Sequence, residues 1–200
     1  MNDRRPAYRH GRKKKNKARG PLAHNCLILI GMPGSGKSTL GRRTANLLDM
    51  PFIDTDTILR QRTGKTTGEL SAAVGGEEFL RQEEQAVCSV RPRKNIVIAT
   101  GGSVVYSEKA MRHLGKLGIV VHIDVPLFIL KRRLRNLHER GVILRPSQTI
   151  DDLYKERTRL YRRHAQVTFA PNKLSPSRSS NCLARLYRFF LESYPKNGVD

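Results

Sequence analysis

The fold is decided by the stretch Gly31-Met32-Pro33-Gly34-Ser35-Gly36-Lys37-Ser38-Thr39, which follows the pattern G-x-x-x-x-G-K-[ST] without a gap. The apolar run 26–30 before it is typical of a buried strand, and residues 37–48 after it are predicted to form a helix. A strand, a glycine-rich turn and a helix are the context in which this motif binds phosphates. The sequence therefore predicts a phosphate-binding loop between the first strand and the first helix.

The residue types in this loop indicate how it would hold a nucleoside triphosphate. Glycines let successive backbone N–H groups turn toward phosphate oxygens, and the N-terminus of the following helix adds partial positive charge. The ammonium of Lys37 is expected to reach the β- and γ-phosphates, and the hydroxyl of Ser38 is expected to ligate Mg²⁺. The predicted ATP-binding residues of the loop are Gly34, Ser35, Gly36, Lys37, Ser38 and Thr39.

Length and composition favour a soluble globular protein. The chain has 200 residues, 38% of them hydrophobic and 28% charged, which suits one domain with a sizeable core. It contains no apolar run long enough to span a membrane and no apolar signal region at its N-terminus. Its three cysteines are scattered, without the spacing of a metal site, so reduced thiols and a cytoplasmic location are expected.

The net charge of +21 favours polyanionic partners. Residues 1–22 hold many of these charges and almost no apolar side chains, and we expect a disordered basic arm ahead of a folded domain at 23–195. Four interpretations of the arm stay open: a solvated tail, a start codon placed too far upstream, a tether to nucleic acid or membrane, and a targeting peptide. Nucleic acid binding is expected, if at all, only through this arm.

From residue 26 onward the pattern alternates between strands and helices. This alternation predicts an α/β fold with a parallel sheet covered by helices on both faces. Strands are expected at 26–30, 51–53, 95–99, 119–123 and 166–169. Helices are expected at 37–48, 77–89, 108–116, 127–138 and 151–164, with Asp151 as the cap of the last of these. A Ser/Pro-rich link at 173–180 is expected to precede a C-terminal helix that packs on the core.

Ligands of such sheets bind beyond the carboxyl ends of the strands, so the residues that follow each strand are candidates. Asp54 and Asp56 would face the same way if the second strand continued, with Asp54 holding Mg²⁺ and Asp56 accepting a hydroxyl proton. The alternative for this pair is the cap of a helix. The adjacent Gly101 and Gly102 would let a ligand approach the main chain closely.

Arginines supply the remaining candidates. Arg81 is interpreted either as a guanidinium fork for a substrate carboxylate or as a surface ion pair with Glu84. Residues 138–149 contain arginines, a glycine and a proline, which is typical of a lid that closes over a nucleotide.

Together these segments resemble the shikimate kinase family. The resemblance runs from about residue 26 to about residue 169 and rests on five motifs in order. The P-loop and the strand-end Asp-x-Asp match residues 31–38 and 54–56. The G-E-x-x-F-R-x-x-E helix is matched through Gly76 to Glu84, with Leu80 for phenylalanine and Arg81 for arginine. The A-T-G-G-G strand end matches 99–103 with Ser103 in the last place, and R-x-P-L-Y matches 157–161 with Arg159 for proline.

The resemblance implies a P-loop kinase fold with strand order 2-3-1-4-5 and transfer of the ATP γ-phosphoryl group to the 3-hydroxyl of shikimate. It implies Mg²⁺ as cofactor and ATP and shikimate as the small-molecule partners. We also expect the protein to act as a monomer. Its implied catalytic residues are Lys37, Asp56 and a lid arginine, for which Arg140 is favoured over Arg145. The implied shikimate-binding residues are Asp56, Arg81, Gly101, Gly102 and Arg157. Arg133 and Arg140 would join the loop in binding ATP, and Ser38 and Asp54 would hold the metal.

Two other functions stay open on the sequence alone. One is a kinase of another small hydroxylated acid such as gluconate, because Ser103 places a side chain beside the expected acceptor pocket. The other is a nucleotide-binding regulatory module whose basic arm binds nucleic acid.

Overall fold

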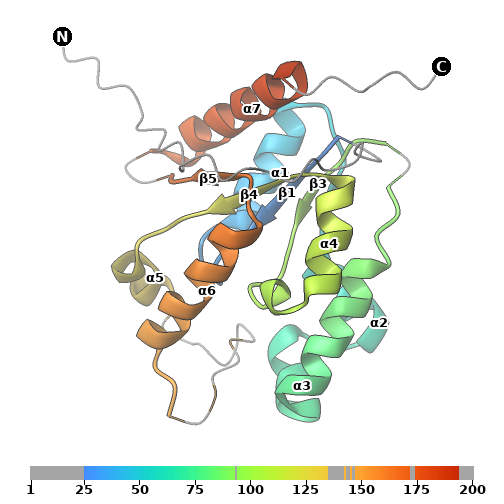
Figure 1. The fold of residues 1–200 in the computed structure, drawn as a ribbon, viewed down its shortest axis with the longest axis vertical. Helices are drawn as coiled ribbons and strands as arrows, with labels where there is room; N and C mark the ends of the chain where they lie inside the picture. The colour runs from blue at the N-terminus through green and yellow to red at the C-terminus, as the bar shows by residue number, and fades with distance from the viewer. Residues whose placement is uncertain are drawn as a thin grey trace.

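A five-stranded parallel sheet carries the fold, and its strands lie in the order β2-β3-β1-β4-β5 (Figure 1). The structure is a computed structural model that describes residues 25–92, 94–134, 142, 145, 147–171 and 174–193. The strands are β1 (Cys26–Ile30), β2 (Phe52–Asp54), β3 (Val97–Ala99), β4 (Gly118–Ile123) and β5 (Val167–Phe169). Every neighbouring pair is parallel. The α/β fold and the strand order implied by the resemblance are confirmed.

The central strand β1 is buried along its whole length, because β3 and β4 pair with its two edges and helices cover both faces. Buried strands of this kind are runs of apolar residues and do not alternate with polar ones. At the start of β4 the two backbones come very close. A Cβ on Gly118 would lie 1.9 Å from the carbonyl oxygen of Cys26, so only glycine fits there.

Helices cover both faces of the sheet, which gives the expected three layers (Figure 1). α1 (Lys37–Leu47) and α7 (Pro176–Ser193) pack together on one face. α4 (Glu108–Leu117), α5 (Leu127–Arg133) and α6 (Ile150–His164) connect β3 to β5, and α4 and α6 lie on the other face. α2 (Thr55–Thr63), α3 (Thr67–Cys88) and the 3₁₀ turn η1 (Val104–Tyr106) lie around the carboxyl ends of the strands.

Two helical boundaries near the second strand differ from the sequence-based expectation. β2 ends at Asp54 and the chain turns at once into α2, with Asp54 as its N-cap. The helix cap considered as the alternative for the Asp54–Asp56 pair is therefore confirmed, although α2 was not among the expected helices. α3 begins at Thr67 and not at residue 77, because Thr66 and Glu69 form a capping box. Gly75, which precedes the start expected at residue 77, lies inside α3 with φ 76° and ψ 171°, and it kinks the helix.

Later boundaries also differ. Asp151 does not cap α6; the cap is Thr149, whose side chain accepts a hydrogen bond from the backbone N–H of Asp152. α5 ends at Arg133, and residues 135–138 of the longer helix that was expected lie outside the described residues. The expected link over 173–180 is wrong for its second half, since α7 already begins at Pro176, and proline suits the first turn of a helix.

Three predictions fall partly or wholly outside the described residues: the arm at 1–22, Arg140, and most of the lid at 138–149. In the part of the chain that the structure describes, no helix combines the length and the apolar character that crossing a membrane requires.

Candidate active site

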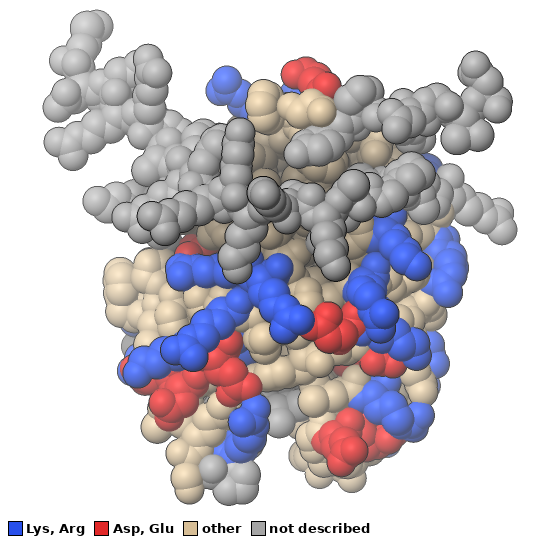
Figure 2. Space-filling view, in the orientation of Figure 1, with Lys and Arg blue, Asp and Glu red and all other residues tan. Residues whose placement is uncertain are grey.

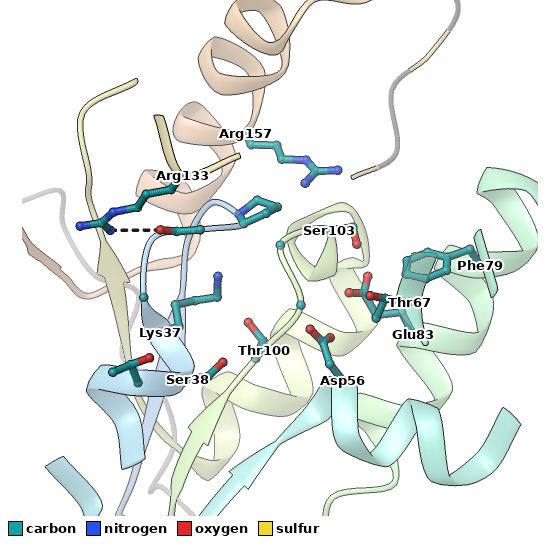
Figure 3. A pocket seen from close by; sticks show the side chains of 16 residues that line it. Lys37, Ser38, Asp56, Thr67, Phe79, Glu83, Thr100, Ser103, Arg133 and Arg157 are labelled. Carbon is teal, nitrogen blue, oxygen red and sulfur yellow. Dashed lines mark hydrogen bonds between the residues drawn. The ribbon is translucent and has the colours of Figure 1, made fainter. Parts of the chain in front are cut away.

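A cavity of about 560 Å³ opens where β1, β2 and β3 end (Figure 3). The register pairs Ala99 with Leu29 on one side and with Asp54 on the other, so the segments that follow the three strands meet. One wall is the phosphate-binding loop, a second comes from α2 and α3, and a third from the turn at residues 100–103. Arg133 and Arg157 line the cavity from α5 and α6.

The phosphate-binding loop is shaped by glycines with positive φ, including Gly34 at 73° and Gly36 at 88°. Gly36 is also the N-cap of α1 and provides no side-chain cap, so the first turn of α1 faces the cavity with its N–H groups. The sequence predicted this arrangement, and it is one that binds phosphate oxygens.

Lys37 lies buried at the base of this loop. Its Nζ donates hydrogen bonds to the carbonyl oxygens of Gly31 at 2.8 Å and Met32 at 2.9 Å. Burial lowers the pKa of Lys37 to about 8, although the carboxylate of Asp56 acts in the opposite direction. The ammonium is therefore held by the loop itself, in a position to bind an anion that enters the cavity.

A second, smaller cavity of about 320 Å³ lies on the other side of the loop. It shares Gly36, Thr39 and Arg133 with the first cavity, and Val125, Ile129, Leu174 and two prolines make much of its lining apolar. The side chain of Arg133 is anchored by a hydrogen bond from Nη1 to the carbonyl oxygen of Gly34 at 3.1 Å (Figure 3). An apolar wall beside a phosphate loop suits a nucleobase.

The two aspartates after β2 do different things. Asp54 is the N-cap of α2, and its Oδ1 accepts a hydrogen bond from the backbone N–H of Asp56 at 3.1 Å. Since α2 begins at Thr55, the pair does not continue the strand as the sequence suggested. Asp56 lines the cavity, and burial together with the neighbouring Asp54 raises its pKa to about 6, while Lys37 lowers it.

A buried carboxyl group, Glu83 of α3, meets Asp56 across the backbone of Gly101. A Cβ on Gly101 would lie 2.0 Å from Oε1 of Glu83 and 3.0 Å from Oδ1 of Asp56, so glycine is required there. Burial raises the pKa of Glu83 to about 7; the hydrogen bond from the Ser103 hydroxyl lowers it, and Asp56 raises it. The Gly-Gly turn thus lets two acidic side chains converge on one spot.

Arg157 is the buried cation of this half of the cavity and projects over it from α6 (Figure 3). It is 2% exposed, and in the described part of the chain no carboxylate lies within ion-pair distance of it. Burial disfavours its charged form, but Tyr161, Tyr106 and Glu83 together act in the opposite direction, so the pKa of Arg157 is raised. Tyr161 also fixes the turn, since its hydroxyl donates to the Gly102 carbonyl at 2.6 Å.

The structure does not bring Arg81 to the cavity. Its guanidinium is exposed and forms a two-pronged ion pair with Glu78, with both N···O distances 2.6 Å. The surface pair that the sequence suggested with Glu84 does not form either, because Glu84 binds Ser107 and Lys109.

The residues of α3 that do line the cavity explain why Arg81 lies outside it. Phe79 and Glu83 line the cavity from α3, so they occupy the places of phenylalanine and the final glutamate in the motif F-R-x-x-E. In that register Leu80, and not Arg81, stands at the arginine of the motif. The sequence-based match was therefore shifted by one residue.

Four cavity residues were not singled out from the sequence: Thr67, Phe79, Glu83 and Thr100. The i, i+4 spacing of Phe79 and Glu83 is the signal that places both on one face of a helix. Of the two lid candidates, Arg145 is exposed and pairs with Glu156 at 2.6 Å, and Arg140 is not among the described residues.

Comparison with known proteins agrees with this geometry. Residues 33–187 match the family described as shikimate kinase. A shikimate kinase from Pasteurella multocida is 33% identical over 152 residues, which cover 74% of this chain and 87% of that protein. One from Aromatoleum aromaticum is 36% identical over 143 residues, covering 70% and 82%.

Solved structures give the same result. The shikimate kinase of Acinetobacter baumannii in complex with shikimate aligns with a TM-score of 0.75 and 28% identity, covering 87% of this chain and 97% of that one. The shikimate kinase of Aquifex aeolicus aligns with a TM-score of 0.70 over 84% of this chain. With its phosphate-binding loop, the cavity beside that loop and these matches over most of its length, the chain belongs to the shikimate kinase family.

Proposed function

We propose that this protein transfers the γ-phosphoryl group of ATP to the 3-hydroxyl of shikimate. The observation that carries the proposal is Arg157, a buried guanidinium without a carboxylate partner among the described residues, in the same cavity as Lys37 and Asp56. A buried cation without a partner is strongly disfavoured unless an anionic ligand pairs with it and neutralises its charge. The carboxylate of shikimate has the charge and the planar shape that such a guanidinium binds.

ATP would lie across the phosphate-binding loop. Its base and ribose fit the apolar second cavity, with Arg133 beside them, and its phosphates face the N-terminus of α1 with Ser35, Gly36, Lys37 and Thr39. Arg140 of the lid is proposed to add positive charge at the γ-phosphate when the lid closes.

Mg²⁺ is expected to bind with the ATP phosphates and to neutralise charge on them. Ser38 and Asp54 fit this role in chemistry, since both are oxygen ligands near the cavity: Ser38 lines it, and Asp54 raises the pKa of the cavity residue Asp56. The described residues contain no group of three acidic, histidine or cysteine side chains that would form a metal site without a ligand.

The acceptor would lie against Gly101 and Gly102 with its carboxylate at Arg157 and its 3-hydroxyl at Asp56. Asp56 would orient this hydroxyl and accept its proton as the oxygen attacks the γ-phosphorus and the bond to the ADP oxygen breaks. Lys37 and the lid arginine would stabilise the charge on the transferred group. Arg81 is left out of the site because Glu78 engages its guanidinium at the surface. We expect the enzyme to act as a monomer in the cytoplasm.

The test is an ADP-release assay with ATP, Mg²⁺ and a panel of shikimate, quinate, gluconate and a nucleoside monophosphate. Turnover with shikimate above all the others is expected. Arg157→Ala should raise the shikimate KM about 30-fold or more, because truncating one partner of a buried charged hydrogen-bonded pair costs about 2–5 kcal/mol, while leaving the ATP KM within about twofold. Gluconate as the better substrate, or an unchanged KM in the variant, would overturn the assignment.

A further inference from the structure

The acceptor half of the cavity depends on one guanidinium. Among the described residues, three cationic side chains line the cavity: Lys37, Arg133 and Arg157. Lys37 and Arg133 are both hydrogen-bonded to the phosphate-binding loop, at Gly31 and at Gly34, so they belong to the nucleotide half. Among the described residues, a carboxylate in the acceptor half therefore has Arg157 as its cationic partner. Recognition by a single arginine relies on how that arginine is held.

Tyr106 contacts Arg157 without lining the cavity itself. It ends the turn η1, five residues after Gly101, and η1 packs against α6, which carries the arginine. Nε of Arg157 donates a hydrogen bond to the Tyr106 hydroxyl at 3.3 Å. The guanidinium carbon also lies 5.1 Å from the centre of the Tyr106 ring, within the range of a cation–π interaction. Tyr106 does not line the cavity, so it acts on a ligand only through Arg157.

The hydrogen bond between Arg157 and Tyr106 determines which nitrogens of the guanidinium stay available to a ligand. An arginine binds a carboxylate with two parallel N–H groups, either Nε with one terminal nitrogen or the two terminal nitrogens. Because Tyr106 engages Nε, the geometry favours the terminal pair for the ligand. Tyr161 acts on Arg157 electrostatically and favours its charged form, and its own hydroxyl is fixed by donating to the Gly102 carbonyl at 2.6 Å.

We propose that Tyr106 is a positioning residue for acceptor recognition: its hydroxyl and ring hold Arg157 so that the terminal nitrogens of this one guanidinium bind the acceptor carboxylate. The inference rests on the proposed function, since it assumes that the acceptor is a hydroxy acid. Holding the fork in its binding orientation lowers the entropy lost when the acid binds.

The experiment compares the acid with a neutral form of the same molecule. KM and kcat are measured for shikimate, for its methyl ester and for ATP, in the wild type, Tyr106→Phe and Tyr106→Leu. The phenylalanine variant keeps the ring and removes one oxygen, whereas the leucine variant removes both contacts. Tyr154→Phe is the matched control, because Tyr154 lies on the same helix as Arg157 and does not line the cavity.

Tyr106→Phe should raise the KM for shikimate about two- to tenfold, the range expected from one lost hydrogen bond. Tyr106→Leu should raise it about ten- to a hundredfold, because the ring contact is lost too. The KM values for the ester and for ATP should stay within about twofold in both variants, as should all values in Tyr154→Phe. This selective loss for the acid is a result that general structural damage does not produce.

An unchanged KM for shikimate in Tyr106→Phe and Tyr106→Leu overturns the proposal, and so does an equal rise for acid, ester and ATP. If the leucine variant does not fold, the phenylalanine variant decides. Wild-type turnover with shikimate is measured first and tests the proposed function separately. If another hydroxy acid of the panel is the substrate, the proposed function fails, and the same comparison of that acid with its ester still tests Tyr106.

Discussion

Asp56 and Glu83 place two carboxyl groups against the same glycine in a buried cavity wall. Removing charge from water is costly, and a second nearby carboxylate adds repulsion, so both groups release their protons less readily than in water. The half of the cavity proposed to hold the acceptor therefore combines a permanent cation, Arg157, with two acids whose pKa values are about 6 and about 7.

This environment predicts a dependence of stability on pH. The pKa of Glu83 rises from 4.5 to about 7 on folding, so in this window the folded protein holds a proton that the unfolded chain has released. The free energy of unfolding therefore falls as the pH rises from about 4.5 to about 7, by about 3 kcal/mol from this residue. Glu83→Gln should remove this part of the loss in urea unfolding curves measured across that range.

Glu77→Gln, which removes an exposed carboxylate from the same helix, is the control for a simple change of net charge. Parallel pH profiles for the wild type and Glu83→Gln would contradict the prediction, because they would show that Glu83 titrates alike in both states.

Arg81 provides a second prediction at this scale. Arg81→Ala removes an exposed ion pair with Glu78, and solvent screens such pairs so strongly that they contribute little to stability. The KM for the acceptor should stay within about twofold of the wild type, in contrast to Arg157→Ala. A tenfold rise in steady-state assays would contradict the geometry and restore Arg81 as the carboxylate ligand that the sequence suggested.

The different outcomes for Arg157 and Arg81 show which parts of the site could be predicted from the sequence. Arg157 and Gly101 follow unambiguous motifs and lie in the cavity as expected. The helix motif that should contain Arg81 begins with a glycine, and this chain has two adjacent glycines, Gly75 and Gly76, at that point. The motif can therefore be aligned in two registers that differ by one residue. One residue turns a helix by about 100°, so the choice decides between cavity and solvent. Glu83 was missed because an acid in a charged helix normally lies at the surface.

The kink in α3 allows one helix to line the cavity at two places. Thr67 in its first turn and Phe79 and Glu83 beyond the kink all contribute to the wall. Gly75 lies between them, with a backbone conformation that is almost restricted to glycine. The helix therefore bends around the cavity and does not run straight past it.

Gly75→Ala should lower the free energy of unfolding by about 1–3 kcal/mol, because the substitution strains the backbone even though nothing lies within 4 Å of the added carbon. Gly76→Ala is the matched control, since that neighbour has helical backbone angles and should tolerate alanine or gain stability. Denaturant unfolding of both variants provides the measurement. Equal stability of the two variants would rule out strain at Gly75.

Elements were easier to predict than their limits. The five strands were recognised from apolar runs, although β2, β3 and β5 are only three residues long in the structure. α2 was missed because its sequence is largely polar and directly follows a strand. At residue 149 a threonine and at residue 151 an aspartate are both good caps, and only the hydrogen bonds distinguish them.

Over the whole molecule, the strand order came from the resemblance to a family and not from the periodicity of the sequence, because many orders satisfy the same β-α alternation. The basic charge is distributed broadly. Figure 2 shows Lys and Arg side chains over the face that carries α4 and α6, interspersed with Asp and Glu. Pairs such as Lys131 with Asp151 and Arg163 with Glu108 account for part of this pattern.

The basic arm at 1–22 gives a prediction for the whole chain. Its deletion should leave kcat and the KM values for ATP and the acceptor within about twofold, because the cavity residues lie in the described domain. The shortened protein should elute from heparin at lower salt, since fewer cationic side chains release counterions. The same elution salt for both proteins would show that the arm makes no such contact, and loss of turnover would show that the arm takes part in catalysis.

The two cavities share Gly36, Thr39 and Arg133, so they are direct neighbours at the phosphate-binding loop. A bisubstrate inhibitor that joins a nucleoside through a phosphate chain to a hydroxylated acid would occupy both at once, and its tethered ends would raise each other's effective concentration. The nucleoside end would be tolerated by any protein with the same loop. Selectivity of such a compound would have to come from the acid end, where Arg157, Glu83 and Ser103 meet it.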